Sequence, residues 1–115
     1  MSDRIHDAEE QHTTSQNGDT VSYLQALWHA DFRPMLVFVA VVELNGIRQA
    51  ARVLGCSEPS VCISLKRFRE KYRHPLFIRE GRKLEPTPEA LSLARKLGKN
   101  FYLLSRTVGG TGLVS

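Results

Sequence analysis

The stretch IRQAARVLGCSEPSVCISLKRFREKY, residues 47–72, decides the fold. In its first part, apolar side chains recur at the i, i+3, i+4, i+7 spacing that places them on one face of a short helix. These residues are Ile47, Ala50, Ala51 and Leu54. Gly55 follows directly, and glycine readily ends a helix in the left-handed conformation. The pattern predicts a two-turn helix over residues 47–54.

A second, longer helix is predicted immediately after the first. Ser57 offers a hydroxyl group to cap it. Apolar residues then recur on one helical face at Val61, Leu65, Phe68 and Tyr72. Only three residues, Gly55 to Ser57, separate the two patterns. Two helices joined by so tight a turn, the second one basic, are typical of a helix-turn-helix.

The segments on either side complete a small, mainly α domain. Upstream, MLVFVAVV over residues 35–42 fits a buried strand as well as a helix, and its periodicity does not decide between them. Downstream, residues 76–85 place apolar-rich flanks around a turn that contains Gly81, which predicts a β-hairpin. Thr87 then caps a further helix with Pro88 at its first position.

The last predicted helix, residues 88–108, carries a heptad-like seam. Its apolar residues fall alternately four and three positions apart, at Ala90, Ala94, Leu97, Phe101 and Leu104. Such a seam predicts a dimer interface, although two heptads with two alanines make a weak coiled coil. The glycines that follow predict a flexible C-terminus over residues 109–115.

The charge of the chain is unevenly distributed. Residues 1–32 hold one base and six acids, a net charge of −5, whereas residues 33–115 hold fifteen bases and six acids, a net charge of +9. Residues 1–30 are therefore expected to form an acidic, largely disordered tail, because residues 1–20 contain almost no apolar side chains. Within it, VSYLQALWHA over residues 21–30 fits a short helix and a partly ordered lead-in about equally well.

Several classes of protein are excluded by composition. The longest uncharged apolar run, Pro34–Val42, is much shorter than the ~20 residues that span a bilayer. The acidic N-terminus is unlike a secretory signal, so we expect a cytoplasmic protein. Cys56, Cys62 and the four scattered histidines do not have the spacing of a disulfide scaffold or a metal site. No catalytic constellation is visible, so we expect neither an enzyme nor a cofactor.

A basic run joins the second helix of the pair to the hairpin. From Lys66 to Lys83 there are eight bases against two acids. A basic helix fits the DNA major groove, with its N-terminal side chains at base edges and its later bases at phosphates. The residue pattern selects Glu58, Ser60, Ser64, Lys66 and Arg67 on the helix, with Arg82 and Lys83 at the hairpin tip near the minor groove. If the basic run is considered by itself, a charged surface that only faces solvent is the alternative to a DNA-binding surface.

These residues, in order along the chain, resemble one known family. The matching positions are Asp31, Phe32, Phe38, Val41, Glu43, Ala50, Ala51, Leu54, Ser57, Pro59, Val61, Leu65, Pro75–Arg79, Arg82 and Pro86–Pro88. The stretch is similar to the N-terminal DNA-binding domain of LysR-type bacterial transcriptional regulators, over roughly residues 31–106. The resemblance implies a winged helix-turn-helix over residues 31–87, with helices at 34–44, 47–54 and 58–72 and a wing at 76–87. The helix from Pro88 becomes a linker and dimerisation helix.

The resemblance also carries residue roles. It implies DNA contacts at Ser57, Pro59 and Ser60, where the recognition helix starts, and at Arg79 and Arg82 near the wing. At position 58 the family usually has glutamine, whereas this chain has Glu58. At the next two departures, Cys62 and Ile63 replace polar residues, and Ile63 could instead touch a thymine methyl group. Altered sequence specificity is the first interpretation and weakened binding the second.

LysR-type regulators also have a longer C-terminal domain that binds a small effector, and this chain ends near where that domain should begin. An excised fragment, a natural truncation and a stand-alone regulator all fit the sequence. The favoured hypothesis is a homodimeric, sequence-specific DNA-binding regulator of transcription that becomes nucleoid-associated on binding double-stranded DNA. The alternatives are an interaction protein that pairs with a full-length LysR-type regulator and a decayed fragment without function.

Overall fold

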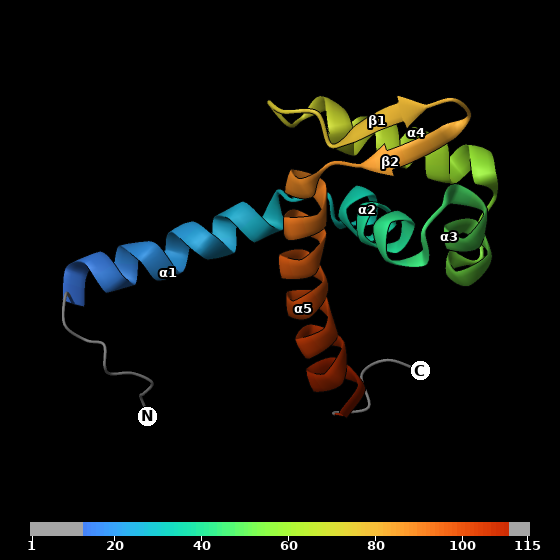
Figure 1. Ribbon diagram of the computed structural model, residues 1–115. Coiled ribbons are helices and arrows are strands. Elements are labelled where there is room, and N and C mark those ends of the chain that lie inside the picture. The colour runs from blue at the N-terminus through green and yellow to red at the C-terminus, as the bar shows by residue number, and fades with distance from the viewer. Residues whose placement is uncertain (1–12, 111–115) are drawn as a thin grey trace. The chain divides into compact units, whose positions relative to one another are not determined.

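The computed structural model describes residues 13–110, with side-chain environments for residues 21–109. Its elements within this range are α1 (Thr13–Trp28), α2 (Phe32–Leu44), α3 (Ile47–Leu54), α4 (Glu58–Glu70), β1 (Phe77–Glu80), β2 (Lys83–Pro86) and α5 (Pro88–Gly110) (Figure 1). The chain divides into two units after Asp31, so α1 belongs to the first unit and every other described element to the second. The expected mainly α class, with one β-hairpin, is confirmed for these residues.

Helix α1 corrects part of the expectation for the N-terminal tail. It begins at Thr13, so residues 13–20 are helical rather than disordered, whereas residues 1–12 lie outside the described residues. Once a helical turn exists, each further residue gains one hydrogen bond for the one residue that is fixed, and the polar residues upstream of Val21 do not block this extension. The large apolar side chains from Val21 to Trp28 remain exposed, Trp28 to 84%.

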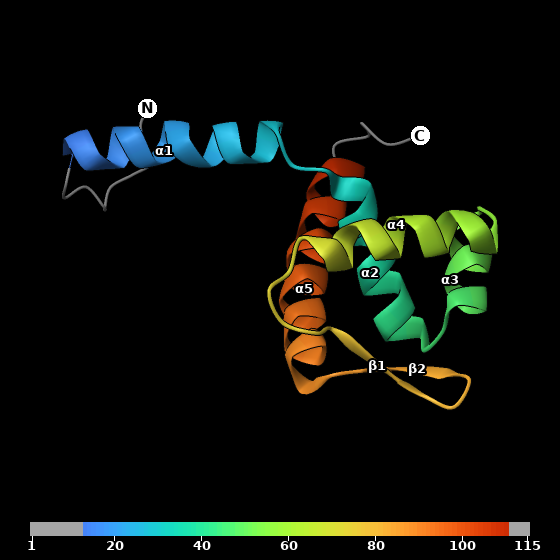
Figure 2. The same ribbon diagram turned by 90° about the horizontal axis from the view of Figure 1, so that it is seen from above.

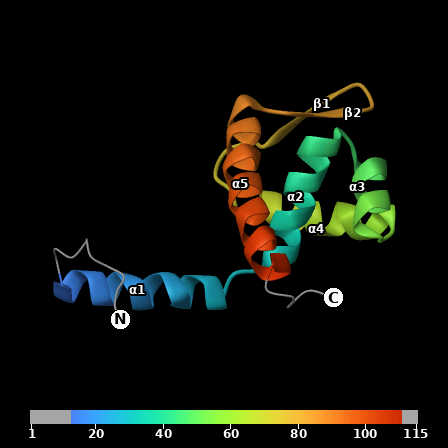
Figure 3. The same cartoon turned by 90° about the horizontal axis from the view of Figure 1, so that it is seen from below.

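Helix α2 lies at the centre of the second unit, which settles the ambiguity of residues 35–42 in favour of a helix. It packs against α3, α4 and α5. Figure 2 and Figure 3 show α2 between α5 and α3, with α4 crossing it. Because α2 is covered from several directions, its sequence is apolar nearly all round and lacks a clear helical period.

The aromatic side chain of Phe38 joins three elements of the core. It is 0% exposed, stacks on Phe68 of α4 with ring centroids 4.6 Å apart, and meets Phe77 of β1 edge-on at 6.0 Å. The small residues Ala50 and Ala51 of α3 are buried in the same core, as expected from the apolar face predicted for residues 47–54. The core therefore fixes the helix pair and the hairpin on one frame.

The hairpin and its exit follow the predicted signals closely. Strands β1 and β2 pair antiparallel from Phe77 opposite Pro86 to Glu80 opposite Lys83, and Gly81 takes a left-handed φ of 64° in the turn. The Thr87 side chain caps α5, where its Oγ1 accepts a hydrogen bond from the Ala90 N–H at 3.2 Å. The same hydroxyl donates to the Pro75 carbonyl at 3.0 Å, which ties the start of α5 to the segment that enters the hairpin.

Candidate nucleic-acid interface

The turn between α3 and α4 is built as the sequence predicts. Gly55 ends α3 in a left-handed conformation with φ 70° and ψ 37°, which glycine adopts without the penalty that a Cβ atom brings. The Cys56 N–H then donates to the Ala51 carbonyl at 3.0 Å. This short connection sets the direction in which α4 leaves the turn.

Helix α4 begins with a side-chain cap. The Ser57 Oγ accepts a hydrogen bond from the Ser60 N–H at 3.2 Å, and the Ser57 hydroxyl donates to the Ser60 Oγ at 2.9 Å. Glu58 and Pro59 occupy the first two helical positions. The capping prediction for Ser57 is confirmed, and the cap places the first side chains of α4 at the protein surface.

The inward and outward faces of α4 divide as expected. Val61 and Leu65 are 0% and 2% exposed and form the inward face. The predicted contact residues lie at the surface, with only Ser64 half-buried: Ser57, Glu58, Pro59, Ser60, Ile63, Lys66 and Arg67. Ile63 is 62% exposed, so a large apolar side chain lies on the mostly polar outer face of α4.

The hairpin presents the second group of predicted contact residues. Arg79, Arg82 and Lys83 are all exposed. Arg82 follows Gly81 at the tip, outside the paired strands. The Lys83 Nζ lies 3.9 Å from the Glu85 Oε2, so part of its charge is balanced within the hairpin.

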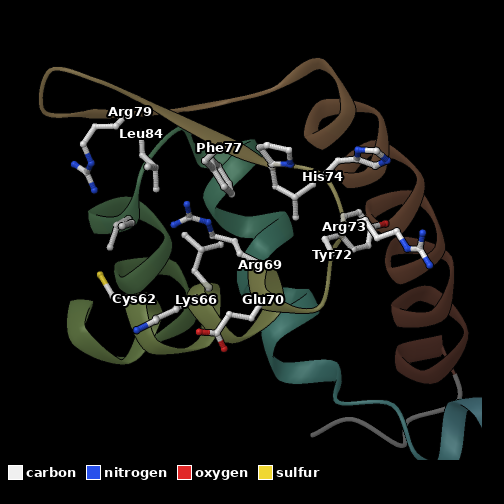
Figure 4. A pocket seen from close by; sticks show the side chains of 14 residues that line it. Cys62, Lys66, Arg69, Glu70, Tyr72, Arg73, His74, Phe77, Arg79 and Leu84 are labelled. Atoms are coloured by element: carbon white, nitrogen blue, oxygen red, sulfur yellow. The ribbon is translucent and has the colours of Figure 1, made fainter.

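An open cleft of about 640 Å³ separates α4 from the hairpin. Figure 4 shows Lys66 and Arg69 on the α4 side and Arg79 and Leu84 on the hairpin side. Four of its lining residues are Lys or Arg, against one acid, Glu70. The cleft is therefore a positively charged groove between the helix and the wing.

The cleft includes basic residues that were not selected from the sequence. The Arg69 guanidinium lies 5.7 Å from the centre of the Phe77 ring, a cation–π distance that joins α4 to β1. Arg73 and His74 line the far end. All three belong to the basic run from residue 66 to residue 83, but only the position of the hairpin shows that they share one groove with Arg79.

Tyr72 forms part of the same cleft and stacks on Phe68 at 5.7 Å. Burial raises the pKa of its phenol above 10.0, and the nearby Glu89 carboxylate raises it further. The phenol is therefore neutral at physiological pH and keeps an O–H donor.

The first part of the α5 seam is already covered within the single chain. Ala90 and Ala94 are 0% and 1% exposed, and both belong to the core. Leu97 and Phe101 are half-buried against the same core, whereas Leu104 is 55% exposed. This burial corrects the expectation for Ala90 and Ala94: a heptad-like spacing identifies a covered face but does not reveal which helix covers it.

Metal-ligand groups and membrane-spanning helices are both absent from the part of the chain that the structure describes. There, no group of three His, Cys, Asp or Glu side chains is placed to hold a metal ion. Within the same residues, no helix is long and apolar enough to cross a membrane. Cys56 and Cys62 are free thiols, the first half-buried and the second exposed.

Comparison with known proteins gives one consistent result. Residues 32–91 match the family described as bacterial regulatory helix-turn-helix protein, lysR family. The chain is 33% identical over 82 residues to the HTH-type transcriptional regulator LeuO of Escherichia coli. It is 37% identical over 73 residues to the HTH-type transcriptional regulator SyrM 1 of Sinorhizobium fredii. These alignments cover 71% and 64% of this chain but only 26% and 22% of the two relatives, so the chain spans about a quarter of their length.

Solved structures show the same fold. A probable transcriptional regulator from Pseudomonas aeruginosa superimposes with a TM-score of 0.63 at 28% identity, over 71% of this chain and 27% of that one. The BenM DBD in complex with catB site 1 DNA also gives a TM-score of 0.63, at 25% identity, and here 74% of this chain matches 94% of the other.

Proposed function

Because this chain belongs to the LysR family of bacterial helix-turn-helix regulators, we propose that it binds double-stranded DNA sequence-specifically as a homodimer and thereby regulates transcription. The observation that carries the proposal is the basic groove between α4 and the hairpin, which combines Lys66, Arg69, Arg73 and Arg79. Four positive charges that converge from α4, the loop after it and β1 suit a phosphate backbone, whose contacts supply most of the non-specific affinity for DNA.

Base reading is proposed for the start of α4. Glu58, Ser60 and Ile63 are exposed on the outward face of the helix. In a helix-turn-helix the N-terminal residues of the recognition helix reach base edges in the major groove. Lys66 and Arg67 follow about two turns after Glu58, where phosphate contacts fix the register. The BenM DBD, which was solved in complex with catB site 1 DNA and matches 74% of this chain, supports DNA binding by this fold.

The hairpin acts as the wing of the proposed reader. Arg82 lies at its tip between the two strands, and Arg79 faces the cleft from β1. An arginine at a wing tip reaches the minor groove, whose negative potential attracts guanidinium groups. The wing thus adds affinity beside the base contacts of α4.

Dimerisation is proposed through the exposed part of α5. Leu103 and Leu104 are 53% and 55% exposed, and half-buried Leu97 lies two turns before Leu104. A two-fold axis between two paired α5 helices would present two α4 helices to half-sites about one helical turn apart. The short apolar strip predicts a weak dimer that DNA stabilises.

Selection of bound duplexes from a random-sequence pool tests the function. The proposal predicts enrichment of a two-fold symmetric motif, with half-sites separated by about one helical turn. Its control is the double variant Arg79→Ala/Arg82→Ala, which keeps α4 intact and should bind the same motif more weakly. Binding without any enriched motif would show a non-specific basic protein and refute the proposal.

A further inference from the structure

Two residues of opposite charge meet between the helices of the helix-turn-helix. The Arg48 Nε of α3 lies 3.7 Å from the Glu58 Oε2 of α4. Both side chains are exposed, Arg48 to 78% and Glu58 to 54%. As a surface ion pair this contact contributes little to folding stability, so its stabilising effect does not explain why the two residues are paired.

The location of Glu58 suggests a role for the pair in DNA binding. Glu58 is the first residue of α4, beside the Ser57 cap, and the start of a helix favours a carboxylate electrostatically. On DNA this position faces the major groove, where the phosphates on either side repel a negative charge. An unshielded carboxylate there weakens binding at every sequence.

Arg48 compensates for the negative charge of Glu58. A guanidinium group has five N–H donors, and the observed contact with Glu58 uses Nε. The same group can therefore hold the carboxylate and face a DNA phosphate. At 3.7 Å the contact is an ion pair rather than a hydrogen bond, so it offsets part of the charge of Glu58 and leaves the carboxylate able to accept a hydrogen bond.

The chemistry of the carboxylate then selects a base. A carboxylate only accepts hydrogen bonds, and in the major groove the N4 amino group of cytosine is its preferred donor. Adenine also offers an amino group, but its adjacent N7 is an acceptor that repels a carboxylate. A glutamine at the same place reads adenine instead, because its amide both accepts and donates.

We infer that Arg48 and Glu58 act as one specificity-determining pair, in which Glu58 accepts from a cytosine N4 amino group and Arg48 is the residue that positions and shields its carboxylate. The inference rests on the proposed function, because it requires α4 to enter the major groove. It names the base preferred at one position of each half-site and adds an α3 residue to the interface.

Selection from the random duplex pool, repeated with variants of the full chain, tests the pair. The parent should enrich a C·G pair at one position of each half-site. Glu58→Gln should change that position to A·T, with a change in relative preference of roughly five- to 150-fold, and leave the rest of the motif unaltered. Arg48→Ala should weaken binding to the cytosine-containing duplex, whereas Arg48→Lys should restore part of it.

Two further comparisons separate positioning from simple charge. Lys99→Ala removes the same charge from an exposed position of α5 and should leave the affinity for the cytosine-containing duplex near that of the parent. In Arg48→Ala/Glu58→Gln, the loss caused by Arg48→Ala should shrink, because no carboxylate remains to be shielded.

Each failure has a distinct meaning. An identical motif for the parent and for Glu58→Gln overturns the pair while the proposed function stands. If Arg48→Ala causes the same loss in the parent and in the Glu58→Gln variant, the positioning role of Arg48 is overturned. A parent that enriches no motif refutes the proposed function and the pair together.

Discussion

The groove between α4 and the hairpin makes a quantitative prediction about salt. Lys66 lies on one side of it and Arg79 on the other, and both side chains are exposed. If each meets one DNA phosphate, Lys66→Ala/Arg79→Ala should make the negative slope of log K against log salt shallower by about 1.8, since each phosphate contact contributes about −0.9. Between 50 and 200 mM salt, the affinity of the variant should therefore fall about 12-fold less than that of the parent.

Fluorescence anisotropy with one labelled duplex, titrated at four or more salt concentrations, measures this slope. The matched control is Lys96→Ala/Lys99→Ala, which removes the same two charges from exposed positions of α5. That control should leave the slope near the value of the parent. Equal slopes for the parent and the groove variant would show that Lys66 and Arg79 do not contact phosphates. Equally shallower slopes for both variants would mean that net charge, rather than the groove, determines the salt dependence.

Three further predictions concern the frame of the site and its assembly. Phe38→Ala should lower the free energy of unfolding by about 3–5 kcal/mol in urea titrations, because the ring is 0% exposed between Phe68 and Phe77; a loss below about 1 kcal/mol would contradict this packing. Gly98→Ala should raise the free energy of unfolding by about 0.5–1 kcal/mol, because alanine favours the helix more than glycine does. A Cβ atom at Gly98 would lie 2.7 Å from Glu43 Oε2, at the flexible end of an exposed side chain that can move away. Destabilisation would mean that this carboxylate cannot move. Leu104→Lys should raise the dimer dissociation constant about 30-fold in sedimentation equilibrium. The reason is that burying a leucine that is 55% exposed contributes about 1 kcal/mol per copy. An unchanged dissociation constant would place the interface elsewhere.

Local signals predicted the helix-turn-helix and the hairpin closely. Gly55, Ser57 and Thr87 each act on the backbone within a few residues, so their effect is visible in the sequence. The bounds of α3 agree with the residues expected from the 47–54 pattern. The contacts proposed for the outer face of α4 and for the wing remain predictions, because they depend on DNA.

Features that depend on packing between elements could not be predicted in the same way. Residues 35–42 were ambiguous because α2 is covered by three other helices, which removes the period that identifies a helix. Ala90 and Ala94 have the spacing of a dimer seam, but the core of the same chain buries them. Arg69 becomes part of the groove only because the Phe77 ring of the hairpin lies opposite it.

The central claim is that the face formed by α4 and the wing reads a DNA sequence. Its most direct test compares the affinity of the full chain for the selected duplex with that for a scrambled duplex of the same composition, at physiological salt. If this face reads the sequence, the ratio of the two affinities should be at least about 1,000, the lower end for specific DNA-binding proteins. Equal affinities for the two duplexes would contradict it.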